Sequence, residues 1–170
     1  MNTKIRFILL ALGAAALAYF LVYEYYYTCV YILGFIGYVV WSQYREGTVF
    51  LATQAFHKQD YEKTKRLLAE IKDPDQLRKG RRNFYEFMQG NLALKEGKIE
   101  EAEYHFQLAS RLPWRKDHEK GMILINLANI NLRKNDHQRV EGYIAVAEKL
   151  KLTERQHDII RKIKSNIEKK

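Results

Sequence analysis

One pattern occurs three times in the second part of the chain, at an offset of 38 residues. At this offset three segments fall in register: KQDYEKTKRLL (58–68), EGKIEEAEYHF (96–106) and KNDHQRVEGYI (134–144). A pattern that recurs at a fixed spacing of about 20–50 residues is typical of stacked helical units, because each unit buries its apolar face against a neighbour. The repeat therefore restricts this region to an all-α array.

Each repeat predicts two helices joined by a tight turn. The turns fall at equivalent positions, namely Gln59, Gly97 and Asn135. The second helix of each unit carries apolar residues at intervals of three and four, which is one face of an α-helix. Small residues are expected where the two helices of a pair cross closely, and the clearest set is Gly90, Ala102 and Ala109.

The units are expected at about 45–77, 83–113 and 121–152, within a repeat domain at 43–170. Residues 153–169 predict a capping helix that covers the last apolar face. Thr153 and Gln156 have the spacing of a capping box at the start of this helix. Isoleucines then form an apolar stripe, at Ile159, Ile160, Ile163 and Ile167.

The pattern resembles the tetratricopeptide repeat (TPR) family. The middle unit carries the resemblance best, in the family order small, turn glycine, small, large, small and proline: Gly90, Gly97, Ala102, Phe106, Ala109 and Pro113. The third unit is similar and the first is weakest. The period exceeds the family's usual length of about 34 residues, which leaves the curvature of a groove open. An unrelated array of helical hairpins is the alternative.

The resemblance implies that the first helix of each unit lines an inner, partner-binding surface. The expected groove residues are Phe84, Phe87, Asn91, Lys95, Asn126, Asn129 and Arg133, with Phe50, Thr53, His57, Met122 and Ile125 beside them. Amides bind a peptide backbone, cations bind carboxylates, and aromatic rings hold apolar side chains. These residue types therefore suit an extended peptide from a protein partner.

Some family members clamp a C-terminal carboxylate with asparagines at the positions of Asn91 and Asn126. Lys164 on the capping helix is a candidate for the cation of such a clamp. Phe87 and Ile160, however, stand where those clamps carry lysine. A true carboxylate clamp is therefore a minor alternative to a general peptide groove.

Positive charge forms a second candidate surface. The formal net charge is +9, and the densest cations are expected on one edge of the array, which we call the basic edge: Arg78, Lys79, Arg81, Arg82, Arg115 and Lys116. Such an edge suits anionic lipid headgroups or an acidic partner. Nucleic acid is less favoured, because no known nucleic-acid-binding module is visible.

Residues 1–42 are apolar and carry few charges. Helices at about 5–23 and 25–41 would form a transmembrane hairpin that turns at the tyrosine-rich segment YEYYYT (23–28). Small residues are expected to form its seam: Ala11, Ala14, Ala15 and Ala18 on one helix, and Gly34 and Gly37 on the other. A cleaved secretory signal and a single tilted span are the alternatives.

Cations flank the hairpin, so the positive-inside rule places both of its ends in the cytoplasm. The expected protein is integral to a bacterial-type cytoplasmic membrane, with its repeat domain on the cytoplasmic side. An adaptor or assembly factor that binds proteins is the leading function. The alternatives are a structural accessory subunit of a larger membrane protein complex and a basic-surface binder of lipid or an acidic partner.

Catalysis finds little support in the sequence. The single cysteine, Cys29, lies in the apolar region, and the five histidines are scattered without a metal-ligand spacing. No phosphate-binding glycine loop and no nucleophile elbow is present. We therefore expect a protein without enzymatic activity, metal or cofactor.

Overall fold

A computed structural model describes the backbone of residues 3–23, 25–46 and 48–168, and the side chains there except those of 3–7, 9, 39–40, 42–46 and 168. Within these ranges all the regular structure is helical and no strand occurs. The all-α fold class predicted from the sequence is therefore confirmed.

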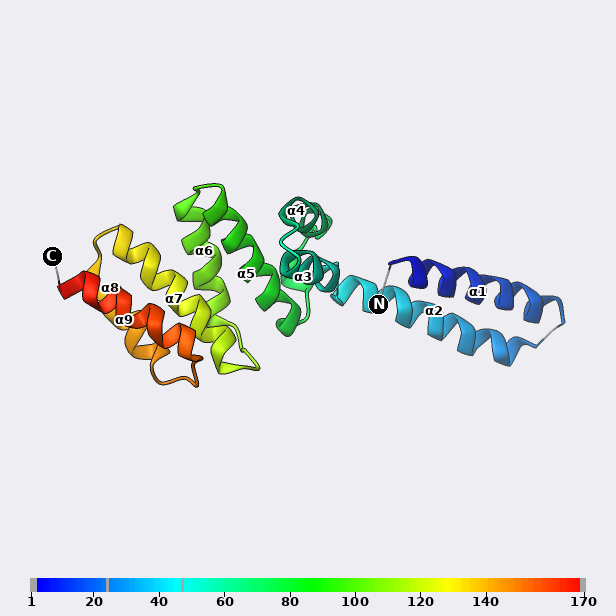
Figure 1. Ribbon diagram of the computed structural model, residues 1–170. Coiled ribbons are helices and arrows are strands. Elements are labelled where there is room, and N and C mark those ends of the chain that lie inside the picture. Colours follow the sequence, from blue (N-terminus) through cyan, green and yellow to red (C-terminus); the bar gives the residue numbers. More distant parts are fainter. Residues whose placement is uncertain (1–2, 24, 47, 169–170) are drawn as a thin grey trace.

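The chain divides into a hairpin of two long helices and a body of shorter ones (Figure 1). The hairpin consists of α1 (Thr3–Val22) and α2 (Tyr26–Glu46). The body contains α3 (Val49–His57), α4 (Tyr61–Ala69), the 3₁₀-helix η1 (Pro74–Gln76), α5 (Lys79–Lys95), α6 (Ile99–Arg111), α7 (Asp117–Arg133), α8 (His137–Ala147) and α9 (Glu154–Glu168). The hairpin projects from one end of the body.

The turns within the three helix pairs of the body share one backbone conformation. Gln59, Gly97 and Asn135 have positive φ angles of 60°, 76° and 57°. The residue that follows each of them donates its N–H to the carbonyl five residues earlier, over 3.0, 2.9 and 3.0 Å. This is the hydrogen bond of a Schellman helix end. The turns thus recur at the spacing of 38 residues that the sequence predicts.

Small residues allow the helices of each pair to cross closely. Ala52, Ala102 and Ala128 are fully buried. A Cβ atom added to Gly90 on α5 would lie 2.9 Å from the ring of Phe106 on α6. Phe106 has no exposed surface, so its ring has no room to move away. Gly90 is therefore required by the packing.

Helices that follow one another in the chain also pack on one another in the body. α3 packs on α4 and α5, α6 packs on both α5 and α7, and α7 packs on α8 and α9. In Figure 1 the first pair, α3 and α4, is seen nearly end-on, whereas α5, α6 and α7 run across the view. The first pair is thus turned relative to the pairs that follow.

The last helix, α9, is held at its start by Gln156. The side-chain oxygen of Gln156 accepts a hydrogen bond of 2.9 Å from the backbone N–H of Thr153, as the predicted capping box requires. The side-chain nitrogen of Gln156 donates to the carbonyl of His118 at the start of α7, over 2.7 Å. One glutamine thus begins α9 and ties it to α7.

The seam of the hairpin differs from the predicted one. Nothing described lies within 4 Å of a Cβ atom added to Gly34 or Gly37, and the four predicted alanines of α1 are exposed: Ala11, Ala14, Ala15 and Ala18. The helices meet instead where Gly13 lies against Ile36, with an added Cβ atom 3.1 Å from that side chain. An isoleucine side chain thus packs against a glycine at this point, and the predicted alanines lie on another face of α1.

The predicted membrane localisation is corrected by the structure. Among the described residues, no helix has both the length and the apolarity to cross a membrane. The expectation of two transmembrane helices in an integral membrane protein is therefore wrong.

Two glycine substitutions test the close crossing of α5 and α6. Gly90→Ala is expected to lower the free energy of unfolding by about 1–3 kcal/mol, because the added methyl group overlaps the ring of Phe106. Gly142→Ala on α8 meets nothing within 4 Å and is expected to raise stability by up to about 1 kcal/mol through helix propensity. Urea unfolding of both variants measures the difference. Equal effects would contradict the packing described.

The left-handed turns give a second test. Gln59 carries a side chain at φ 60°, a conformation that costs a non-glycine residue about 1–2 kcal/mol. Gln59→Gly is therefore expected to stabilise the protein by up to about 1 kcal/mol. The matched control is Gln54→Gly inside α3, which should destabilise it by a similar amount. A loss of stability in Gln59→Gly would contradict the assigned turn.

Candidate functional site

One cavity in the body has a volume of about 470 Å³, within the range of about 300–1,000 Å³ typical of ligand pockets. We call it the aromatic pocket. Its lining comes from α3, α5, α7, α9 and the link between α6 and α7: His57, Phe84, Phe87, Trp114, Lys116, His118, Glu119, Met122, Thr153 and Gln156. It thus lies on the side formed by the first helices of the pairs.

Three rings form the apolar wall of this pocket. The ring of Trp114 lies 5.4 Å from that of Phe84 and 6.4 Å from that of Phe87, with the planes steeply inclined. The indole N–H of Trp114 donates to the carbonyl of Ala109 over 2.8 Å. This bond and the ring contacts hold Trp114 in place, so the wall is formed before any ligand arrives.

The polar part of the lining is accessible. Lys116, His57 and His118 are exposed, and Glu119 is partly buried. Gln156, in contrast, is buried and uses both ends of its amide within the protein. A ligand in the aromatic pocket would therefore meet a lysine, two histidines and one glutamate.

Five of the seven predicted groove residues fall into two groups. Phe84 and Phe87 line the aromatic pocket, and Asn126, Asn129 and Arg133 lie further along α7 on the helical face of Met122. That face follows from spacings of three and four residues, which place side chains above one another on a helix. Asn126 and Asn129 are partly buried and Arg133 is exposed.

Two other predicted groove residues interact within the protein. The Asn91 amide donates to the carbonyl of Phe87 over 2.7 Å. The Lys95 ammonium lies 3.4 Å from the centre of the Tyr61 ring, a cation–π contact that joins α5 to α4. The structure thus gives both residues a role in local packing, which the sequence pattern did not indicate.

The structure brings the two halves of the basic edge together. The Asn83 amide donates to the carbonyl of Pro113, and Phe84 contacts Trp114, so the start of α5 lies beside the link between α6 and α7. Four of the six cations are exposed, namely Arg78, Lys79, Arg115 and Lys116.

The other two cations of the basic edge make contacts within the protein. The Arg81 guanidinium lies 5.6 Å from the centre of the Phe50 ring. Arg82 pairs with Asp75 and, over 3.5 Å, with the buried Glu86. Arg82 therefore contributes less to the charge of the basic edge than the four exposed cations do.

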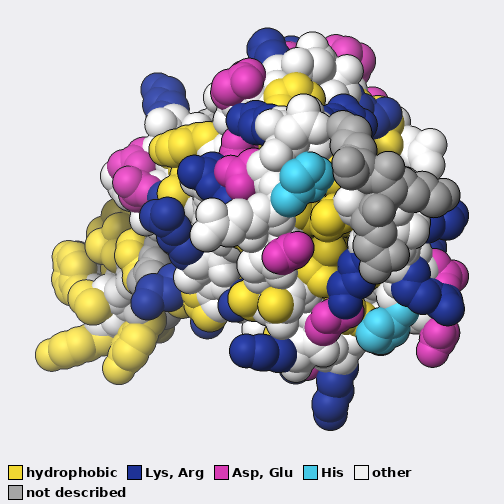
Figure 2. All heavy atoms as spheres, turned by 90° about the vertical axis from the view of Figure 1, so that its left-hand side faces the viewer, with side chains coloured by type: hydrophobic (Ala, Val, Ile, Leu, Met, Phe, Trp, Pro, Cys, Tyr) yellow, Lys and Arg dark blue, Asp and Glu magenta, His cyan; other side chains and the backbone are white. Residues whose placement is uncertain are grey.

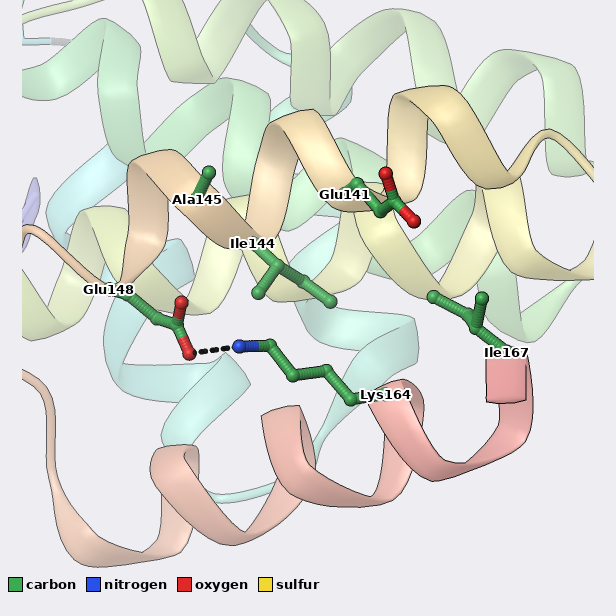
Figure 3. Close-up of a pocket in the computed structure, with 6 residues that line it drawn as sticks. All are labelled: Glu141, Ile144, Ala145, Glu148, Lys164 and Ile167. Atoms are coloured by element: carbon green, nitrogen blue, oxygen red, sulfur yellow. Dashed lines mark hydrogen bonds and ion pairs between the residues drawn. The ribbon is translucent and has the colours of Figure 1, made fainter. Parts of the chain in front are cut away.

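Lys164, the predicted clamp cation, lines another cavity, of about 280 Å³, between α8 and α9 (Figure 3). Its ammonium is 2.7 Å from the Glu148 carboxylate, and the apolar side chains of Ile144 and Ile167 line the same cavity. Seen from this end of the molecule, side chains of both signs are interspersed over the surface (Figure 2). This face therefore lacks the excess of one charge that marks the basic edge.

Two buried glutamates, which sequence reasoning missed, join neighbouring helices. The Glu86 carboxylate on α5 forms a hydrogen bond of 2.7 Å with the His105 ring on α6. Glu103 on α6 accepts a hydrogen bond of 3.2 Å from Asn131 on α7 and pairs with Lys134. Burial raises the pKa of Glu103, but the bonds from Lys134 and Asn131 outweigh it and hold that pKa below its ordinary value.

Other residues of the aromatic pocket were also missed, chiefly Trp114, Glu119 and Gln156. Trp114 stands in a link, and the groove was sought on the first helices alone. A tryptophan directly after Pro113, at the start of a charged link, was the available signal. In the part of the chain that the structure describes, no cluster of three or more His, Cys, Asp or Glu residues has the arrangement of a metal site.

Comparison with known proteins adds no further assignment. No protein-family model, curated protein or solved structure matches this chain. The functional argument therefore depends on the geometry and charge of its own residues.

The Glu103 cluster predicts a dependence of stability on pH. The pKa of Glu103 is lower in the folded protein than its ordinary value of 4.5, so the unfolded state binds more protons in acid. Its contribution is therefore fully present above the unfolded pKa and is lost as the pH falls through the folded pKa.

Glu103→Gln is expected to cost about 1–3 kcal/mol near neutral pH, because Lys134 loses its charged partner. This difference from the unmodified protein should shrink as the pH falls through the folded pKa of Glu103, because Glu103 itself then becomes protonated. Urea unfolding at several pH values measures both. Glu141→Gln, exposed on α8, is the control with little expected effect. A difference that persists unchanged in acid would contradict the assigned pKa direction.

Proposed function

We propose that residues 48–168 form a short α-solenoid of the TPR-like kind and act as a protein-interaction module. Three observations support an array: the left-handed turns that recur every 38 residues, the packing of successive helices on one another, and the terminal helix α9, which covers the apolar side of α7. Arrays of this kind bury each unit against its neighbours and offer one continuous surface to a partner.

The aromatic pocket is the observation that carries the proposed function. It is a preformed apolar cavity on the side of the first helices, and Asn126 and Asn129 continue along the same face of α7. An extended peptide presents backbone amides and carbonyls at regular intervals together with side chains that enter pockets. The proposed ligand is therefore an extended segment of a protein partner, and the proposed role is that of an adaptor or assembly factor.

The two asparagines have suitable chemistry for such a ligand. Each carries one acceptor and two donor hydrogens, so a single side chain can bond both the N–H and the C=O of a peptide unit. Both are partly exposed. The side chains of Asn91 and Asn131 donate hydrogen bonds to backbone carbonyls, whereas those of Asn126 and Asn129 form no hydrogen bond within the described part of the chain. They therefore remain available to a partner.

A peptide-display selection on the full-length protein tests this function. Peptides that are enriched should bind the unmodified chain, and the double variant Asn126→Ala with Asn129→Ala should bind them about 5- to 100-fold more weakly, as expected for two lost hydrogen bonds. The fold should persist, because both side chains lie partly exposed on α7. Isothermal titration measures the affinities and circular dichroism checks the helix content.

The control is Asn166→Ala, which removes an exposed asparagine from α9 on another part of the body. It should leave peptide affinity unchanged. Enrichment of no peptide above an unrelated helical protein would contradict the proposed function. Equal weakening by the control and by the double variant would contradict the assigned surface.

A further inference from the structure

We infer that the aromatic pocket and the basic edge form one recognition surface for an acidic segment of a partner protein, in which a large apolar side chain enters the pocket and flanking carboxylates meet the cations. This inference rests on the proposed function and specifies its ligand. It follows from two independent features of the structure: the rings that line the cavity and the distribution of paired and unpaired charges around it.

The pocket suits one large side chain. Phe84, Phe87 and Trp114 surround it with steeply inclined rings, and Met122 adds a flexible apolar contact. Aromatic rings prefer edge-to-face or offset contacts with a further ring over a flat sandwich. An entering tryptophan or phenylalanine can make such contacts with this wall, so an aromatic anchor is favoured over a small residue.

The cations next to the pocket lack partners of opposite charge nearby. Arg78, Lys79, Arg115 and Lys116 are exposed, and no ion pair of theirs occurs within the described ranges. Lys116 belongs both to the basic edge and to the lining of the pocket. It therefore joins the two features at a single side chain.

The neighbouring carboxylates are mostly engaged elsewhere. Asp75 pairs with Arg82, and Asp117 accepts the backbone N–H of Lys151 over 3.2 Å. Glu119 is the one carboxylate in the pocket lining, and it is partly buried. The surface around the pocket thus keeps an excess of positive charge, which complements an acidic ligand.

A protein segment fits this arrangement better than a nucleic acid does. Single strands bind where bases stack on exposed ring faces beside a positive groove. Here the three rings are partly buried and turned toward one another, and Glu119 would lie close to a phosphate. A side chain that enters from a peptide avoids both problems.

Fluorescence anisotropy with the full-length protein tests the inference, using three labelled peptides with blocked ends. The first has a central tryptophan flanked on each side by two glutamates. In the second, lysines replace the glutamates, and in the third, alanine replaces the tryptophan. The first peptide is expected to bind at least about tenfold more tightly than either of the others. Its advantage over the lysine peptide should shrink as salt rises, because exposed charges are screened.

Matched variants separate the two parts of the surface. Lys116→Glu should weaken the acidic tryptophan peptide by about fivefold or more, whereas Lys149→Glu, exposed beyond α8, should not. Met122→Ala should weaken the tryptophan peptide and leave the alanine peptide unchanged, because it removes an apolar contact in the pocket. Val146→Ala, at a side chain that is 46% exposed on α8, is its control.

The outcomes also distinguish this inference from the proposed function. If display selects peptides that depend on Asn126 and Asn129 but show no preference for acidic or aromatic residues, the inference is overturned and the proposed function stands. Equal binding of the tryptophan and alanine peptides would likewise overturn it, since charge alone would then suffice. Tighter binding of a labelled oligothymidine that Lys116→Glu abolishes would assign the surface to nucleic acid and overturn it too.

Discussion

The contact between Gly90 and Phe106 determines how the middle of the body is built. Because glycine has no Cβ atom, α5 and α6 approach until the Phe106 ring lies directly on the α5 backbone. The ring of Phe106 also contacts that of Phe87, with 6.2 Å between centres, so the same contact fixes a residue of the aromatic pocket. The left-handed conformation of Gly97 then returns the chain immediately, which keeps the two helices paired along their length.

The link that follows this pair completes the pocket. Asn83 on α5 binds the carbonyl of Pro113, and Trp114 binds the carbonyl of Ala109 at the end of α6. Both bonds hold the link against the pair it leaves, so the Trp114 ring is positioned before α7 begins. Gln156 adds α9 to the same corner through the carbonyl of His118. Side-chain hydrogen bonds to backbone carbonyls at or near helix ends thus hold the parts of the pocket together.

Local chemistry explains which features were predictable. The turns at Gln59, Gly97 and Asn135 and the capping contact of Gln156 depend on residues close in sequence, and the repeat pattern indicated them. The hairpin seam and the ion pairs of Arg82 depend on which face of a helix meets a neighbouring element. The alanines of α1 indicated one face, whereas the contact is made by Gly13 of α1 and Ile36 of α2. In the sequence Arg82 is one of several neighbouring cations, and nothing marks it as different. In the structure it forms an ion pair with Glu86, which lies one turn further along α5.

The charge distribution follows from the same packing. Buried glutamates form ion pairs with nearby cations: Glu86 pairs with Arg82 on the same helix, and Glu103 on α6 pairs with Lys134 at the end of α7. At the turn between α5 and α6, hydrogen bonds from Lys65 and Lys98 lower the pKa of Glu96 to about 2, so this carboxylate stays charged and occupied. These carboxylates are therefore engaged within the protein, whereas no ion pair within the described residues involves Arg78, Lys79, Arg115 or Lys116. Part of the net charge of +9 thus lies beside the aromatic pocket, where Asp75 and Asp117 are engaged within the protein.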